Sequence, residues 1–167
     1  MDILRAMDLE DANIVWSVMQ GVLVGLYVQL EEIGGAPFAA FKAFGRRAVL
    51  NALGRVGWDA RPEDDHSAKL LRSTVIGLLD TFAHDEPSIA AEARRRFDLH
   101  FTNPSVLPGE YKTTVYRIVL MNGGEEEYNR VKATYYATED NIERKYATYY
   151  DITHIPTSDP LYLIPYH

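Results

Sequence analysis

Five histidines are the side chains of this sequence best suited to bind a metal ion or to transfer a proton, and they lie far apart. They are His66, His84, His100, His154 and His167. A catalytic zinc site commonly uses two histidines one helical turn apart, as in His-Glu-x-x-His, because both ring nitrogens then reach one ion from one face. No two of these histidines are three or four residues apart. The spacing therefore predicts no metal site and no catalytic residue in this chain.

Two runs of charged residues offer further chemistry. Arg94-Arg95-Arg96 carries guanidinium groups, which hold a carboxylate with paired hydrogen bonds. Neighbouring residues on a helix point about 100° apart, so the three groups cannot all face one ligand. A solvated surface is the favoured interpretation, with Arg94 and Arg95 as candidates for a contact with a peptide. The same geometry argues against an ion site at Glu125-Glu126-Glu127 and favours the first turn of a helix, where the dipole stabilises acidic side chains.

The remaining composition excludes several classes of function. The chain lacks a Gly-x-Ser-x-Gly motif, a phosphate-binding glycine loop and a dinucleotide fingerprint, so no cofactor is expected. It has no cysteine, which rules out disulfides and thiol catalysis. Lys and Arg number 17 against 24 Asp and Glu, and this net charge of -7 argues against nucleic acid as a partner. The acidic N-terminus does not resemble a signal peptide, and we expect a cytoplasmic protein.

The elements that would position these side chains are predicted to be helices. Apolar residues recur at intervals of three and four along a first segment that ends at Gly34-Gly35, and along a second that ends near Gly57. A third stripe continues through Leu71, Val75, Leu78 and Phe82, and a fourth begins after Pro87. Residues 115–120 have strand propensity, but a single strand would have no partner, so we predict a helix there as well.

Residues 12–30 carry no charge, and their number is close to the roughly 20 residues that span a bilayer. Polar residues dilute the segment and no basic residue flanks it closely on either side. We therefore predict a buried helix of a soluble domain and no membrane partner, because a helix that is apolar all round also occurs in protein cores.

The order of helices predicts an all-α fold of antiparallel hairpins, with about seven helices of roughly 12 to 20 residues each. The last of them begins at a capping box, Asp140 to Glu143. Three prolines, at 156, 160 and 165, exclude a long helix at the end of the chain. We divide the chain into a helical-repeat domain, residues 1–150, and a Pro-rich tail, residues 151–167, that begins a further incomplete hairpin. We expect a truncated solenoid that self-associates through its exposed C-terminal face.

Several motifs, taken in order, resemble the C-terminal helical domain of the puromycin-sensitive type of zinc aminopeptidase. The residues that carry this resemblance, which implies a structural role for each of them, are Trp16, Gly57, Trp58, Asp59, Leu71, Arg72, Phe97 and Tyr116. The resemblance implies a HEAT-like α-solenoid that closes over a catalytic domain and shapes a chamber for peptide substrates. It also implies that zinc and the catalytic residues lie on a part of the enzyme that this chain lacks.

A second interpretation belongs to another class of protein. Helical solenoids offer extended concave surfaces for binding. The chain would then be a stand-alone helical-repeat module that binds or regulates a partner and has no peptidase activity. A free-standing module should be a monodisperse monomer, whereas a domain separated from its enzyme should expose apolar surface and self-associate.

Overall fold

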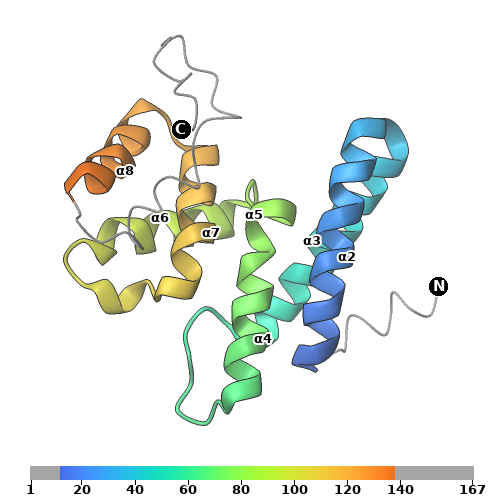
Figure 1. The fold of residues 1–167 in the computed structure, drawn as a ribbon, viewed down its shortest axis with the longest axis horizontal. Helices are drawn as coiled ribbons and strands as arrows, with labels where there is room; N and C mark the ends of the chain where they lie inside the picture. The colour runs from blue at the N-terminus through green and yellow to red at the C-terminus, as the bar shows by residue number, and fades with distance from the viewer. Residues whose placement is uncertain (1–11, 138–167) are drawn as a thin grey trace, which may run out of the picture.

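The computed structural model describes residues 12–137, and all regular secondary structure in that range is helical (Figure 1). Six α-helices have 12 or more residues: α2 (Asn13–Ile33), α3 (Gly35–Val56), α4 (His66–Gly77), α6 (Pro87–His100), α7 (Gly109–Asn122) and α8 (Glu125–Ala137). A single turn, α5 (Leu79–Phe82), follows α4, and the 3₁₀ helix η1 (Pro104–Val106) precedes α7. The predicted all-α class is confirmed for these residues, including the helix over 115–120. The helix predicted from Asp140, the tail and the expected truncation lie outside the described residues.

Glycine and proline set the helix boundaries where the sequence predicts them. Gly34 ends α2 and Gly57 ends α3, with φ angles of 66° and 69°, in the left-handed region that favours glycine. The N–H of Gly57 donates to the carbonyl of Leu53 at 2.7 Å. Pro87 occupies the first turn of α6, where its missing N–H costs nothing.

Leu78 interrupts the third predicted helix, so the expectation of one continuous helix from Leu71 to Phe82 is wrong. The N–H of Leu78 donates to the carbonyl of Val75 at 3.2 Å, a bond of the tighter 3₁₀ type, and α4 ends at Gly77. Gly77, the last residue of α4, lowers the helix propensity at this break. Leu78 and Phe82 are nevertheless both fully buried, so the apolar spacing identified the core face correctly but not the break.

The helices pack in successive layers around one core. The pair α2 and α3 lies side by side at one end of the molecule (Figure 1), and α4 packs against both. Next, α7 packs against α4 and α5, and α6 and α8 pack against α7. The largest apolar side chains buried between the layers are Trp16, Tyr116, Phe82, Phe97, Ile76, Leu78, Leu79, Leu107, Ile118 and Val49.

Only one face of α2 is buried, which contradicts the prediction of a buried helix for residues 12–30. Trp16 and Leu23 are its buried residues, whereas Ile14, Val18 and Val22 are 57% or more exposed. By length and composition, α2 is the one helix within residues 12–137 that could cross a membrane, and 11% of its most apolar stretch is buried. Its outward face has no neighbour among the described residues because α3 and α4 both lie on the Trp16 side.

Candidate functional site

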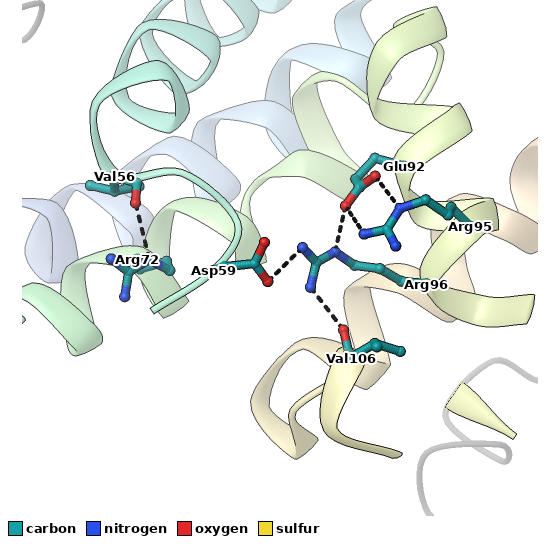
Figure 2. A network of polar contacts seen from close by, with 7 residues as sticks. All are labelled: Val56, Asp59, Arg72, Glu92, Arg95, Arg96 and Val106. Carbon is teal, nitrogen blue, oxygen red and sulfur yellow. Dashed lines mark hydrogen bonds and ion pairs between the residues drawn. The ribbon is translucent and has the colours of Figure 1, made fainter. Parts of the chain in front are cut away.

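Four of the motif residues, Gly57, Trp58, Asp59 and Arg72, lie in or contact the loop between α3 and α4, residues 57–65. Buried Arg96 contacts the same loop (Figure 2). The loop begins where Gly57 ends α3 and finishes where Asp65 caps α4. The Asp65 carboxylate accepts a hydrogen bond from the N–H of Ala68 at 2.8 Å. This cap accounts for the helix start at His66.

Arg96 anchors the first half of this loop by hydrogen bonds. Its guanidinium donates to the carboxylates of Glu92 and Asp59 and to the carbonyl oxygen of Val106, each at 2.8 Å (Figure 2). The guanidinium carbon also lies 5.2 Å from the centre of the Trp58 ring, within the range of a cation–π contact. The side chain is 1% exposed. Arg96 thus joins α6, the loop and η1 through one buried cation.

Arg72 holds the two ends of the loop in the same way. Its Nε donates to the carbonyl oxygen of Val56 at 3.1 Å, and its Nη2 forms an ion pair with Asp64. Asp64 also accepts from the backbone N–H of Arg61 at 2.6 Å, and this bond, followed by the Arg72 guanidinium, lowers the pKa of the Asp64 carboxyl. Nη1 of Arg72 is buried without a hydrogen-bond partner in the described part of the chain. Tyr111, whose pKa is raised by burial, lies close to this guanidinium.

Arg94 and Arg95, the candidates for a peptide contact, are bound to carboxylates of the chain itself. Arg95 forms two hydrogen bonds with Glu92, at 2.8 and 2.7 Å, and lowers the pKa of that carboxyl. Arg94 forms an ion pair with Glu127 of α8. Both guanidiniums remain partly exposed. Their proposed contact with a peptide stays a prediction.

Glu127 caps the start of α8, so the acidic run lies in a first helical turn as predicted. Its carboxylate accepts from the N–H of Gly124 at 2.7 Å, which is one half of a capping box. This backbone bond, together with Arg94, lowers the pKa of Glu127 to about 2.

The other motif residues belong to the core. Trp16, Leu71, Phe97 and Tyr116 are all buried, and the rings of Phe97 and Tyr116 meet edge to face at 5.2 Å. The Tyr116 hydroxyl lies 2.7 Å from Nε2 of buried His100, and Nδ1 of His100 lies 2.6 Å from the carbonyl oxygen of Phe97. Both ring nitrogens of this histidine are therefore engaged in packing the domain.

Arg96 is the functional residue that the sequence argument missed. Its position carries a signal, because Ile89, Ala93 and Phe97 form the buried apolar face of α6 and residue 96 lies on the same face. A cation on an apolar face predicts a buried partner, but the sequence does not show that the partner is Asp59, which is 37 residues away.

The described residues bring no set of catalytic groups together. Between residues 12 and 137 no three His, Cys, Asp or Glu side chains are placed to hold one metal ion. His66 is exposed at the start of α4, and Nδ1 of His84 lies 2.9 Å from the carbonyl oxygen of Asp80. Burial raises the pKa of the Asp80 carboxyl, which pairs with Arg117 at 3.1 Å. These contacts lie at α5 and join it to α7.

Two comparisons with known proteins agree on the kind of domain. A family model described as "ERAP1-like C-terminal domain" matches residues 1–150. Aminopeptidase M1 of Arabidopsis thaliana is 30% identical over 98 residues, which are 56% of this chain and 11% of that protein. The chain therefore spans about a tenth of the length of this relative.

Proposed function

Because the chain belongs to the ERAP1-like C-terminal domain family, we propose that it is the non-catalytic C-terminal helical domain of a zinc aminopeptidase, an enzyme that removes N-terminal residues from peptides. The observation that carries this proposal is the family match over residues 1–150, together with the helical fold of the part described. The likeness to an aminopeptidase supports it. The puromycin-sensitive type is the finer assignment that we propose within this family.

The domain acts by shape in this proposal. Its helices form a HEAT-like wall that closes the chamber in which a peptide reaches the catalytic domain, and that domain is its partner. The polar side chains support this role, since the best-connected ones hold the loop 57–65 and helix ends rather than open onto a reaction site. Arg94 and Arg95, at the surface of α6, are proposed to meet the peptide. The expected compartment is the cytoplasm.

Zinc belongs to the remainder of the enzyme. Zinc in a catalytic site needs three converging protein ligands, and in this proposal the catalytic domain supplies them. When bound there, the metal would activate water for attack on the peptide bond. Within the whole enzyme, the residues of this chain would orient and enclose the substrate.

The proposal is tested on the complete polypeptide encoded by the transcript that contains this chain. We expect a His-Glu-x-x-His motif upstream of Met1, and hydrolysis of an aminoacyl reporter that a zinc chelator abolishes. Removal of residues 1–167 should change the rate on long peptides more than the rate on the reporter. The isolated chain, assayed in parallel, should neither bind zinc stoichiometrically nor hydrolyse the reporter.

Two outcomes would contradict the proposal. Stoichiometric zinc and turnover in the isolated chain would make it an enzyme in its own right. A complete polypeptide without a peptidase motif would favour the alternative, a stand-alone helical-repeat module that binds or regulates a partner.

A further inference from the structure

The outward face of α2 is a continuous apolar surface that no described element covers. We call it the outer strip, and its members are Ile14, Val18, Gly21, Val22, Gly25 and Val28. With 100° between successive residues, these positions fall within about 120° of the helix circumference, opposite buried Trp16 and Leu23. The four aliphatic side chains are 53–72% exposed. Exposed apolar residues in one contiguous strip indicate a contact surface rather than random surface composition.

Two glycines in the middle of the outer strip allow a second helix to approach closely. A Cβ atom built on Gly21 or on Gly25 would meet nothing within 4 Å, so neither glycine is required by packing inside the domain. Glycine in the middle of a helix is destabilising relative to alanine. Small residues four apart let the backbones of two helices come together. An incoming helix would account for both glycines.

The C-terminal end of α2 lacks a cation. Glu31 and Glu32 lie in the last turn, which contains no basic residue. The negative end of the helix dipole disfavours acidic side chains there and favours Lys or Arg. No ion pair to either glutamate is found among residues 12–137. A partner with a basic residue at this end of α2 would supply the missing charge.

We propose that the outer strip binds an antiparallel helix from another part of the same polypeptide, with apolar residues facing Gly21 and Gly25 and a Lys or Arg beside Glu31 and Glu32. The inference rests on the proposed function, which supplies that polypeptide. It continues an established arrangement, because α4 and α7 each have helices packed on two sides while α2 has them on one. The matched segment is 11% of the aminopeptidase relative, so most of such a protein is available to cover α2.

Charge disfavours two other occupants of the outer strip. Two copies of α2 packed in parallel would bring their Glu31 and Glu32 pairs together. Like charges held close together repel each other. A helix that lies on a bilayer normally carries Lys and Arg at its polar edge, whereas α2 is flanked by acids.

Thiol labelling tests the proposal, since the chain has no cysteine of its own. Val22→Cys places a thiol on the outer strip, and Ala43→Cys, at an exposed position of α3, is the matched control. Each variant is made in the isolated chain and in the complete polypeptide, and maleimide labelling of that cysteine is followed by peptide mass spectrometry. We expect Cys labelling at position 22 to be at least about tenfold slower in the complete polypeptide, because a covered side chain reacts only during local opening. Labelling at position 43 should be equal in both.

A charge reversal provides the second measurement. Glu32→Lys should raise the urea midpoint of the isolated chain, because it places a cation at the helix C-terminus. In the complete polypeptide it should lower the midpoint, because it removes the ion pair with the covering helix.

The outcomes separate this inference from the proposed function. An active zinc aminopeptidase in which position 22 labels as fast as in the isolated chain overturns the inference alone. A polypeptide that begins at Met1 overturns the proposed function and the inference together. A disulfide-linked dimer through position 22 in the active enzyme, or flotation with phosphatidylcholine vesicles that Val22→Lys abolishes, would assign the outer strip to a second copy or to lipid instead.

Discussion

Replacement of Arg96 by methionine should destabilise the domain far more than the same change at Arg95. Both arginines lie on α6 and both bind Glu92, so the pair is a matched comparison. Methionine keeps the apolar stem of the side chain and removes the guanidinium. At position 95 the lost contact is an exposed ion pair within one helix, worth about 0.2–1 kcal/mol.

Position 96 loses more because its partners differ. The carbonyl oxygen of Val106 would lose its donor in a half-buried position, and a large part of the roughly 1–3 kcal/mol cost of a buried unpaired acceptor would apply. The contact with the Trp58 ring contributes about 0.5–1 kcal/mol. The carboxylates of Glu92 and Asp59 are 25% and 80% exposed and can return to water, so each pair adds only about 0–1 kcal/mol. We expect Arg96→Met to lower the free energy of unfolding by about 2–4 kcal/mol.

Urea unfolding followed by circular dichroism measures the difference. With a slope of about 2 kcal/mol per molar, the midpoint of Arg96→Met should fall by about 1–2 M. Arg95→Met should stay within about 0.5 M of the wild type. Equal losses at the two positions would refute the reasoning, because they would mean that the buried geometry around Arg96 adds nothing to an ordinary surface ion pair.

Two further predictions concern packing and pH. Gly45→Ala should destabilise the domain by about 1–3 kcal/mol, because its Cβ would lie 2.2 Å from a Phe82 ring carbon. Gly54→Ala should stabilise it by about 0.4–1 kcal/mol, because nothing lies within 4 Å of the added Cβ. Calorimetry of both variants checks this difference in sign. Glu127 has a pKa lowered from 4.5 to about 2, so its contribution to stability is complete above about pH 4.5 and is lost as the pH falls toward 2. Glu127→Gln should make the urea midpoint depend less on pH between these values. An unchanged dependence of the midpoint on pH would show that the Gly124 bond does not lower the pKa of Glu127.

The helix boundaries could be predicted because they depend on local chemistry. Gly34, Gly57 and Pro87 fix their own backbone geometry whatever packs against them. The break at Leu78 was not predicted because the apolar spacing continues across it, although Gly77 lowers the helix propensity there. The same limit explains the error on α2, since the charge-free sequence shows that a helix can be buried but not that a neighbour is present to bury it.

The arginine run shows where sequence reasoning succeeds and where it stops. The prediction that the three adjacent side chains diverge is confirmed. Arg94 reaches Glu127 on α8, Arg95 binds Glu92 on its own helix and Arg96 is buried. The direction of each side chain follows from helix geometry. Which of the three is buried depends on Asp59 and on η1, and these partners are fixed only by the tertiary fold.

The two buried arginines connect the helix pair that carries the outer strip to the rest of the domain. The α2–α3 pair ends at Gly57, and the loop that follows is tied to α4 by Arg72 and to α6 by Arg96. A helix packed on the outer strip would therefore hold the α2–α3 pair in place, and the hydrogen bonds of the two guanidiniums connect that pair to the remaining helices. Under the proposed function, replacing either arginine should change the rate at which the enzyme hydrolyses long peptides. The zinc site, on another part of the polypeptide, should keep its activity on a small reporter.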